Sequence, residues 1–356
     1  MAWLLYGANG YTGTLVARLA VARGERPVLA GRSAAKIAAL AGELGPELEQ
    51  RAFGLEDPDA IRRGLDGVTA VAHCAGPFSA TAGPMARACV NAGVHYLDVT
   101  GEIDVFEELH GLSGRARAAG VVLLPGAGFD VVPTDCVAAL LARALPGAQR
   151  LDLAFLAGGG PSPGTARTAV EGMGKGGKGG KGGKARVDGV IVDVPLGWRT
   201  IRAGFPSGPR TVASVPWGDV STAYYSTGIG TITTYTAVPG AVLAAARLPG
   251  LSRLLALDPV QRLGHALAGA RVPGPSDERR ARTRSEVWGR ASAGDQAVEA
   301  ALSAPNVYDV TADSVVRAVT RLHSVEPGTH TPSSAFGAEF VTELDGVKLT
   351  GPGPVT

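Results

Sequence analysis

A glycine-rich turn between an apolar strand and a helix is the feature that most constrains the fold of this chain. Residues 2–8, AWLLYGA, have the composition of a buried strand, and Gly7, Gly10 and Gly13 then open an amphipathic segment. In such a turn the first glycine permits the reversal, the second admits a diphosphate, and the third lets helix and strand pack closely. The N–H groups and dipole of the helix then favour an anion. The pattern predicts a dinucleotide-binding βαβ unit, with a purely structural turn as the alternative.

The same alternation of strand and helix continues to about residue 130. Short apolar runs predict strands at 2–8, 26–31, 48–54, 68–76, 94–100 and 120–127. Segments with helical periodicity lie between them, at 11–24, 33–45, 57–67, 81–93 and 102–120. Runs that are apolar on both faces are typical of strands covered by helices on both sides. We therefore expect an α/β fold, a Rossmann-type doubly wound parallel sheet.

The pattern changes after a further helix at 133–145. Strands are expected at 151–157, 187–197, 210–217, 231–238, 282–292 and 295–304, with a tight turn at Asp188-Gly189. Helices are expected at 240–268 and 311–324, and a last one after Thr331 as N-cap with Pro332 at its first position. This pattern predicts a second α+β domain of mostly antiparallel strands.

The expected domain boundaries follow from this change. Residues 1–135 form the dinucleotide-binding domain, 136–330 the α+β substrate or lid domain, and 331–356 a C-terminal segment that packs back on the first domain. Within the second domain, GMGKGGKGGKGGK repeats glycine and lysine but has Gly179 where a phosphate-binding Walker loop needs Ser or Thr. We expect a mobile, solvated Gly-Lys loop at 174–185.

Composition narrows the class of protein. The chain has 356 residues, 45% apolar content and a formal net charge of +2, which gives no reason to expect nucleic acid as a partner. Its three cysteines form no CxxC pair, and the N-terminus lacks the basic and apolar regions of a signal peptide. Prolines and arginines interrupt the apolar region 237–270, so a transmembrane helix is not expected there. We expect a cytoplasmic protein; a homodimer and peripheral membrane contact are compatible with the sequence.

The end of the second strand distinguishes the two nicotinamide cofactors. An NAD site usually has Asp or Glu there, which binds the ribose hydroxyls, whereas this sequence has Arg32, Ser33 and Lys36. Cationic and hydroxyl donors suit the 2′-phosphate of NADP(H). The sequence therefore favours NADP(H), with solvated surface cations as the alternative.

Three loops follow the carboxyl ends of later strands, where ligands bind in open α/β sheets. They are 73–83, 98–102 and 125–135, and each mixes glycine with polar side chains. For each acid in these loops, capping of a helix is an alternative to catalysis. The candidate proton donors are Tyr96, Asp98, Glu102, Asp130 and, from the second domain, Tyr224.

At these loops the sequence resembles the saccharopine dehydrogenase-like reductases, in particular the branch described as trans-acting enoyl reductases. The matching pieces are YGANGYTG, HCAGPF, ACVNAGVHYLDVTGE, LLPGAGFDVVPTD, PWGDVSTAYYSTG and TPSSAFGAEF. The resemblance implies an NADP-type Rossmann domain, an α+β domain over its carboxyl edge, and reduction of a C=N or polarised C=C bond. His73 stands where many relatives are expected to have asparagine.

The function expected is therefore NADPH-dependent reduction of an imine or an enoyl bond in a small or acyl-type metabolite, without a metal. The alternatives are an NADP-binding redox sensor and a lipid- or acyl-carrier-binding protein built on 237–270. Sequence patterns for the short-chain dehydrogenase Tyr-x-x-x-Lys pair, the GxSxG elbow and the HExxH zinc site are absent. The residues expected to contact the cofactor are Gly7, Asn9, Gly10, Tyr11, Thr12, Gly13, Arg32, Ser33, Lys36, Cys74, Ala75, Gly76, Pro77, Thr100 and Gly126.

Overall fold

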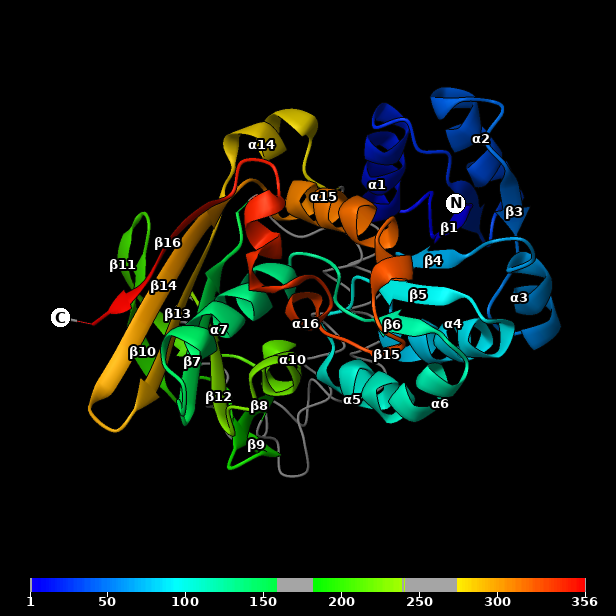
Figure 1. The fold of residues 1–356 in the computed structure, drawn as a ribbon. Helices are drawn as coiled ribbons and strands as arrows, with labels where there is room; N and C mark the ends of the chain where they lie inside the picture. Colours follow the sequence, from blue (N-terminus) through cyan, green and yellow to red (C-terminus); the bar gives the residue numbers. More distant parts are fainter. Residues whose placement is uncertain (1, 159–181, 239, 241–273, 356) are drawn as a thin grey trace. The chain divides into compact units, whose positions relative to one another are not determined.

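The computed structural model describes all residues except 1, 159–181, 239, 241–273 and 356 (Figure 1). The chain divides into two units, each made of two segments. The first unit contains Met1–Val132 and Tyr308–Gly337, and the second contains Pro133–Val307 and Ala338–Thr356.

The first unit is built on a parallel seven-stranded sheet. Its strands are β1 (Trp3–Tyr6), β2 (Val28–Gly31), β3 (Gln50–Ala52), β4 (Ala70–His73), β5 (His95–Asp98), β6 (Val122–Leu124) and β15 (Gly328–Thr329). They lie in the order β15-β6-β5-β4-β1-β2-β3, and every pairing is parallel. The strand order reverses between β1 and β4, and in open sheets such a reversal opens a crevice for ligands.

Helices connect the first six of these strands in the way the sequence predicts, whereas β15 and the placement of α15 in this unit were not predicted. They are α1 (Tyr11–Ala22), α2 (Ala34–Leu44), α3 (Pro58–Gly64), α4 (Phe78–Ala92), α5 (Ile103–Gly111), α6 (Ser113–Ala118), α15 (Val307–Val319), the 3-10 turn Leu322–Ser324, and α16 (Pro332–Phe336). Helix α16 starts as expected, with Thr331 as N-cap in a capping box. Helix α4 begins at Phe78, three residues before the expected start, because the carboxylate of Glu102 binds its first N–H groups.

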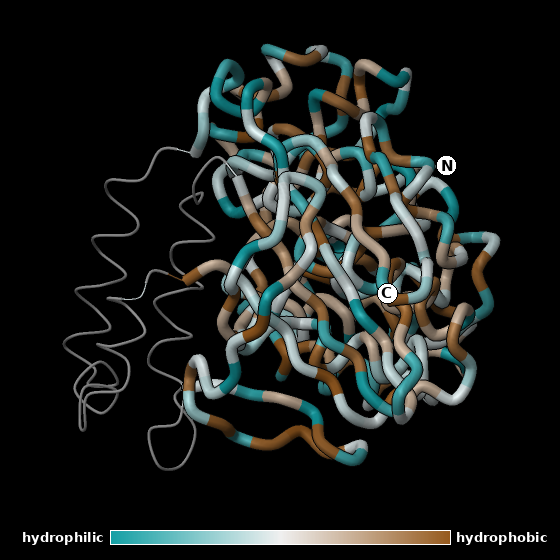
Figure 2. Tube along the Cα trace, turned by 90° about the vertical axis from the view of Figure 1, so that its left-hand side faces the viewer, coloured by the Kyte–Doolittle hydropathy of each residue, from teal (hydrophilic) through white to brown (hydrophobic). Residues whose placement is uncertain are grey.

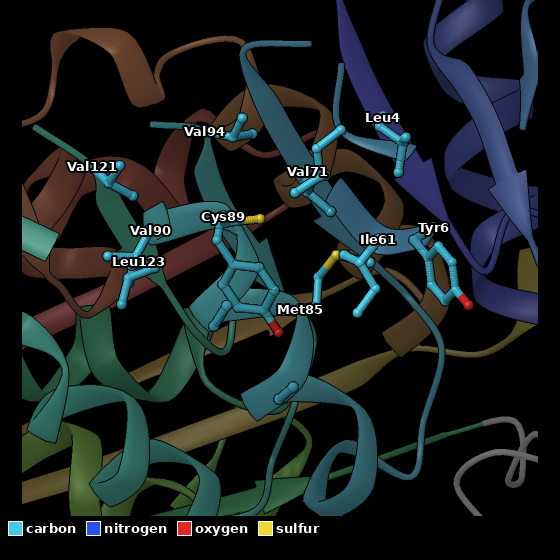
Figure 3. Close-up of a cluster of buried hydrophobic side chains, with 14 of the residues drawn as sticks. Leu4, Tyr6, Ile61, Val71, Met85, Cys89, Val90, Val94, Val121 and Leu123 are labelled. Carbon is cyan, nitrogen blue, oxygen red and sulfur yellow. The ribbon is translucent and has the colours of Figure 1, made fainter. Parts of the chain in front are cut away.

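One buried apolar cluster joins this sheet to its helices (Figure 3). Leu4, Val71 and Leu123 come from three of the parallel strands, and Met85 and Cys89 come from α4. All five are fully buried. Burial of apolar side chains against strands that are themselves buried explains the continuous apolar runs seen in the sequence.

The second unit is built on a mixed nine-stranded sheet. Its strands are β7 (Arg150–Leu156), β8 (Gly182–Val187), β9 (Val190–Pro195), β10 (Thr200–Phe205), β11 (Gly208–Ser214), β12 (Thr231–Thr236), β13 (Ser285–Ala293), β14 (Gln296–Ala304) and β16 (Lys348–Pro354). The main order is β10-β11-β12-β7-β13-β14-β16, and β8 pairs with β12 and β9. Among the described strands of this second sheet, only β7 and β12 pair in parallel, which confirms the expected mostly antiparallel sheet.

The described helices of this unit are α7 (Val132–Ala144), α10 (Asp219–Thr227), α14 (Asp277–Arg282) and the 3-10 helix Ala338–Glu343. The sequence did not predict α10, α14, β10 or β16. Helix α10, DVSTAYYST, consists largely of residues with low helix propensity, and β16 contains Pro352 and Pro354, which usually disfavour a strand. Prolines are accepted in β16 because it is an edge strand.

The last residues of the expected Gly-Lys loop form a strand. The predicted range of the loop was 174–185, but Gly182–Val187 form β8, and Lys184 lies opposite Asp193 of β9. Pairing with β9 holds the last residues of the repeat in extended form, and the turn falls at Asp188-Gly189 as predicted. The rest of the loop lies outside the described residues, as does the expected helix at 240–268.

The chain returns to the first unit earlier than the sequence-based division placed it. That division began a third segment at residue 331, whereas residues 308–337 group with the first unit and 338–356 with the second. Two hydrogen bonds explain the return: Phe129 N donates to Thr311 Oγ at 3.0 Å, and Ser314 Oγ donates to the carbonyl of Ala127 at 2.6 Å. Strand β16, which pairs with β14, accounts for the last segment.

Hydrophobic and hydrophilic stretches are interspersed along the described trace (Figure 2). Among the described residues, no helix combines the length and the apolar character needed to cross a membrane.

Gly289 of β13 sets how closely α7 packs on the second sheet. A Cβ at this position would lie 2.7 Å from Val137 and 2.8 Å from Leu141, both on α7. We expect Gly289→Ala to lower the free energy of unfolding by ~1–3 kcal/mol, because the added methyl overpacks this contact. Urea denaturation measures the change. Gly204→Ala is the control, since its Cβ would meet nothing closer than 3.6 Å; equal stability loss in both variants would contradict the explanation.

Candidate functional site

The carboxyl ends of three central strands lie in register. Tyr6 of β1 pairs with His73 of β4, and His73 pairs with Asp98 of β5. The loops that follow these residues are the glycine turn, the loop 74–77 and the loop 99–102. The loops selected from the sequence in this part of the chain are therefore neighbours on one edge of the sheet.

The glycine turn has the geometry that its sequence predicts. Gly7 has a φ of +81°, and its N–H donates to the carbonyl of Ala30 at 2.8 Å. A Cβ on Gly13 would overlap the carbonyl oxygen of Gly7, so only glycine lets α1 start this close to β1. Gly10 is the exposed N-cap of α1; it has no side chain to cap this end, and the first turn contains no acidic residue. Such an end favours an anionic ligand.

The loop after β4 lies directly against this turn. Cys74 N donates to the carbonyl of Tyr6 at 2.8 Å. A Cβ on Gly7 would lie only 2.9 Å from the backbone N and from the Cβ of Ala75. The turn and the loop that contains Gly76 and Pro77 therefore pack as one surface, and both Gly76 and Gly10 are exposed on it.

The residues expected to recognise the 2′-phosphate lie at the carboxyl end of β2. Arg32 and Lys36 are exposed, and Ser33, the N-cap of α2, makes no capping hydrogen bond with its side chain. Within the described part of the chain no ion pair to Arg32 or Lys36 is found. Asn9 lies beside this strand end, since its Oδ1 is 2.9 Å from where a Cβ of Gly31 would be. Two cations and a hydroxyl are thus presented next to the glycine turn.

Asp98 is a buried acceptor for three donors. It receives Tyr96 Oη at 2.7 Å, Thr100 N at 3.0 Å and Gly126 N at 3.0 Å, and it is 0% exposed. Burial raises the pKa of Asp98 to about 6, and the hydrogen bonds from Thr100 and Gly126 oppose this rise. Asp98 therefore ties the loop after β5 to the loop after β6.

Tyr96, a candidate proton donor, is also fully buried. Burial and the nearby Asp98 carboxyl raise the pKa of Tyr96 well above its ordinary value. Its hydroxyl proton is directed at Asp98, so the geometry gives these two candidates a role in holding the loops.

Glu102 caps a helix, but not the one that follows it in sequence. Its Oε1 accepts from Phe78 N and its Oε2 from Ser79 N, both at 3.0 Å, so its carboxylate closes the start of α4. Thr100 is fully buried, and its Oγ accepts from Glu102 N at 3.1 Å. Two of the acids chosen from the sequence, Asp98 and Glu102, thus cross-link three loops of the sheet edge.

Asp130 lies at the same edge and, unlike Asp98, is a partly exposed residue. Its Oδ2 is 3.0 Å from where a Cβ of Gly101 would be. Burial of the carboxyl raises the pKa of Asp130 to about 6. A carboxyl with that pKa is partly protonated near neutral pH and suits proton transfer.

Tyr224 belongs to the second unit, where it lies on α10. The guanidinium of Arg186 stacks over its ring, 4.2 Å from the centroid. Arg186 is itself buried and donates to the carbonyls of Val220 and Gly189 at 2.8 and 2.7 Å. These contacts give Tyr224 a packing role in its own unit; its role as a proton donor stays a prediction.

The second unit contains a buried polar cluster, formed by Thr134, Asp135 and Asp219, that was not predicted from the sequence. Asp219, at the start of α10, accepts from Thr134 Oγ at 2.9 Å, and both side chains are buried. Burial raises the pKa of Asp219 well above its ordinary value, and the charge of Asp135 adds to the rise. The two acids, Asp135 in VPTD and Asp219 in WGD, are visible in the sequence, but they lie so far apart in the chain that their proximity could not be predicted.

His73 is the other residue whose environment the sequence did not reveal. It is 0% exposed, neither ring nitrogen has a hydrogen-bond partner among the described residues, and its ring contacts Tyr6, Phe78 and Tyr96. Burial lowers the pKa of His73 to about 3, so it is neutral in the folded protein. The signal available in the sequence was a histidine at the end of an apolar strand.

Comparison with known proteins agrees with this geometry. Residues 3–124 match the family model described as the saccharopine dehydrogenase NADP binding domain. Over these residues the first unit is therefore similar to the NADP-binding Rossmann domain of saccharopine dehydrogenase, which confirms the resemblance seen in the sequence.

Two relatives show how far the similarity extends. A probable mitochondrial saccharopine dehydrogenase-like oxidoreductase of Arabidopsis thaliana is 28% identical over 147 residues, which are 37% of this chain and 32% of that protein. A trans-acting enoyl reductase of Mycobacterium leprae is 31% identical over 140 residues, 37% of this chain and 33% of that protein. The aligned segment spans about a third of the length of these relatives.

Solved structures share the fold across the whole chain. Saccharopine dehydrogenase (L-Glu forming) of Saccharomyces cerevisiae gives a TM-score of 0.58 at 12% identity, covering 98% of this chain and 100% of that one. Homospermidine synthase of Legionella pneumophila, solved in complex with NAD, gives 0.64 at 11% identity, covering 98% and 91%. Both confirm the predicted fold, a Rossmann domain with a second mixed-sheet domain.

The buried imidazole of His73 predicts a measurable pH dependence of stability. The pKa of His73 is about 3 in the folded chain and near 6.5 when exposed, so the unfolded chain binds the extra proton between these values. The contribution of neutral His73 to the free energy of unfolding is therefore fully present above pH 6.5 and decreases as pH falls toward 3. As pH falls through this window, the free energy of unfolding of His73→Phe should therefore rise relative to that of the unmodified protein by ~1.4 kcal/mol per pH unit.

Urea denaturation at several pH values gives the difference between the two proteins. His323→Phe is the comparison variant, since it replaces an exposed histidine in the 3-10 turn Leu322–Ser324. A difference between His73→Phe and the unmodified protein that does not change with pH would contradict a neutral buried imidazole.

Proposed function

We propose that the protein is an NADPH-dependent reductase that delivers hydride to a C=N or polarised C=C bond of a small or acyl-type metabolite. The observation that carries the proposal is the start of α1 at the Gly7–Gly13 turn, where the N-cap Gly10 has no capping side chain and the first turn contains no acid. Helix termini need partners for their N–H groups, and a diphosphate supplies them. The NADP-binding family of residues 3–124 supports this choice of ligand.

The residues present fit the cofactor. The turn from Gly7 to Gly13 would hold the diphosphate, while Arg32, Ser33 and Lys36 would hold the 2′-phosphate. Cationic and hydroxyl donors suit a dianionic phosphate, and no acid stands at the end of β2 to select the free ribose hydroxyls of NAD. The exposed Gly76 and the adjacent Pro77 would lie beside the nicotinamide ribose.

The cofactor, when bound, supplies the hydride, and the protein must orient the substrate and supply a proton. Among the candidates of the first unit we assign the proton to Asp130. Asp130 is a partly exposed residue, whereas Tyr96 and Asp98 bind one another in the interior and Glu102 caps α4. With a pKa of about 6, Asp130 can donate a proton from its neutral form and recover it from water between turnovers.

Arg32→Ala tests the choice of cofactor. Loss of the guanidinium should weaken NADPH binding about tenfold, since a charge-assisted hydrogen bond contributes roughly 1.5–3 kcal/mol, and leave NADH binding unchanged. Fluorescence titration of both cofactors measures the two dissociation constants. Arg26→Ala is the control, because it removes an exposed arginine just before the amino end of the same strand. An equal effect on NADPH and NADH would contradict the assignment.

Asp130→Asn tests the proton donor. We expect kcat to fall roughly 100-fold with cyclic imines or enoyl thioesters, because general acids contribute about that factor, while NADPH binding is unchanged. The neutral form of Asp130 is the active one, so kcat of the unmodified protein should fall as pH rises through about 6.

Steady-state oxidation of NADPH at several pH values measures both effects. Asp66→Asn, a substitution of an exposed acid, is the control. A pH profile of Asp130→Asn identical to that of the unmodified protein would exclude this carboxyl as the donor. A protein that binds NADPH but oxidises it with no imine or enone would instead be the redox sensor considered from the sequence.

A further inference from the structure

Glu102 joins two loops of the sheet edge through backbone hydrogen bonds. It lies at the end of the loop after β5, yet both of its carboxylate oxygens accept from N–H groups at the start of α4, from Phe78 and Ser79, at 3.0 Å each. Its own N–H donates to the hydroxyl of Thr100, and Thr100 N donates to Asp98. The backbone of Glu102 is thus fixed by Thr100, and its carboxylate points at the start of the neighbouring helix α4.

Helix α4 depends on this carboxylate because it has no cap of its own. Its N-cap is Pro77, whose side chain cannot accept a hydrogen bond, and no acid lies in its first turn. Helix α1 starts at the same sheet edge, after the neighbouring strand β1; its N-cap Gly10 has no capping side chain, and its first turn contains no acid. Both helix starts favour an anion, and at the start of α4 this anion is the carboxylate of Glu102.

The start of α4 also determines where the loop before it lies. Thr81 Oγ donates to the carbonyl of Ala75 at 2.7 Å and to that of Pro77 at 3.0 Å. Ala75 lies against Gly7, where a Cβ would approach to 2.9 Å. A displacement of α4's first turn would therefore be transmitted through Ala75 to the turn proposed to bind the diphosphate.

We propose that Glu102 is a positioning residue for the cofactor. It holds the loop 74–77 against the Gly7 turn, and it neutralises the start of α4, so that the diphosphate binds at α1. The role rests on the proposed function, since it concerns the site for NADPH. It assigns Glu102 no contact with the reacting atoms.

Three variants test the role of the carboxylate. Glu102→Ala should raise the dissociation constant of NADPH about tenfold, the effect of losing a helix cap. Glu102→Gln keeps one acceptor oxygen and should show a smaller rise. Glu108→Ala is the matched control: Glu108 lies on α5 and pairs with Arg87 of α4, so it removes a carboxylate between the same elements away from the loop.

Formate provides the readout that a general loss of structure would not show. As a small carboxylate it can occupy the space left in Glu102→Ala and accept from Phe78 and Ser79. Addition of formate should restore NADPH affinity in Glu102→Ala and leave the unmodified protein and Glu108→Ala unchanged. Amide hydrogen exchange without cofactor should show lost protection at Phe78 and Ser79 in Glu102→Ala only.

The outcomes separate this inference from the proposed function. Unchanged NADPH affinity in Glu102→Ala, or a loss that formate does not restore, overturns the role of Glu102 while NADPH binding by the unmodified protein stands. If Glu102→Ala does not fold, Glu102→Gln decides, and an affinity equal to that of the unmodified protein overturns the role. Absence of NADPH binding by the unmodified protein overturns both.

Discussion

The missing side chain at Gly13 is the constraint on which the first unit depends. Because no Cβ separates it from the carbonyl of Gly7, helix α1 begins directly above the end of β1 and presents its N–H groups at the edge of the sheet. Gly7 in turn admits Ala75 from the loop after β4. Two close backbone approaches thus bring the loops of β1 and β4 together, and a larger residue at either glycine would separate them. The proposed diphosphate site exists because of what these residues lack.

Carboxylates at the same edge serve mainly to hold backbone in place. Asp98 and Glu102 together receive N–H groups from four residues in three loops. Each of these bonds provides an acceptor for a backbone N–H group that would otherwise lack one, either in the interior or at the start of a helix. The arrangement leaves a rigid rim in which Asp130 is the partly exposed acid with a raised pKa. Of the three acids that suggested acid–base chemistry in the sequence, Asp98 and Glu102 hold the loops in place, and Asp130 is the one proposed to transfer a proton.

The sequence predicted the first sheet well because its signals are local. Continuous apolar runs mark buried parallel strands, and the glycine turn and the Thr331 cap each lie within a few residues. It failed where a distant residue decides the structure: α4 starts early because of Glu102, and β16 accepts prolines because it lies at a sheet edge. The same holds for the site. Its loops could be identified from the sequence, but neither the three donors to Asp98 nor the unpartnered imidazole of His73 could, because each depends on contacts between separate strands.

The way the chain leaves and re-enters the first unit affects how this protein can fold. Strand β15, which completes the parallel sheet beside β6, comes after the whole second unit in the sequence. During synthesis the edge of β6 therefore emerges long before its partner, and closing so large a loop is entropically costly and slow. Until β15 arrives, β6 presents unpaired backbone groups that another chain could bind. The central strands of the second unit can pair before β15 is synthesised. The position of this two-residue strand in the sequence therefore determines which sheet can be completed first.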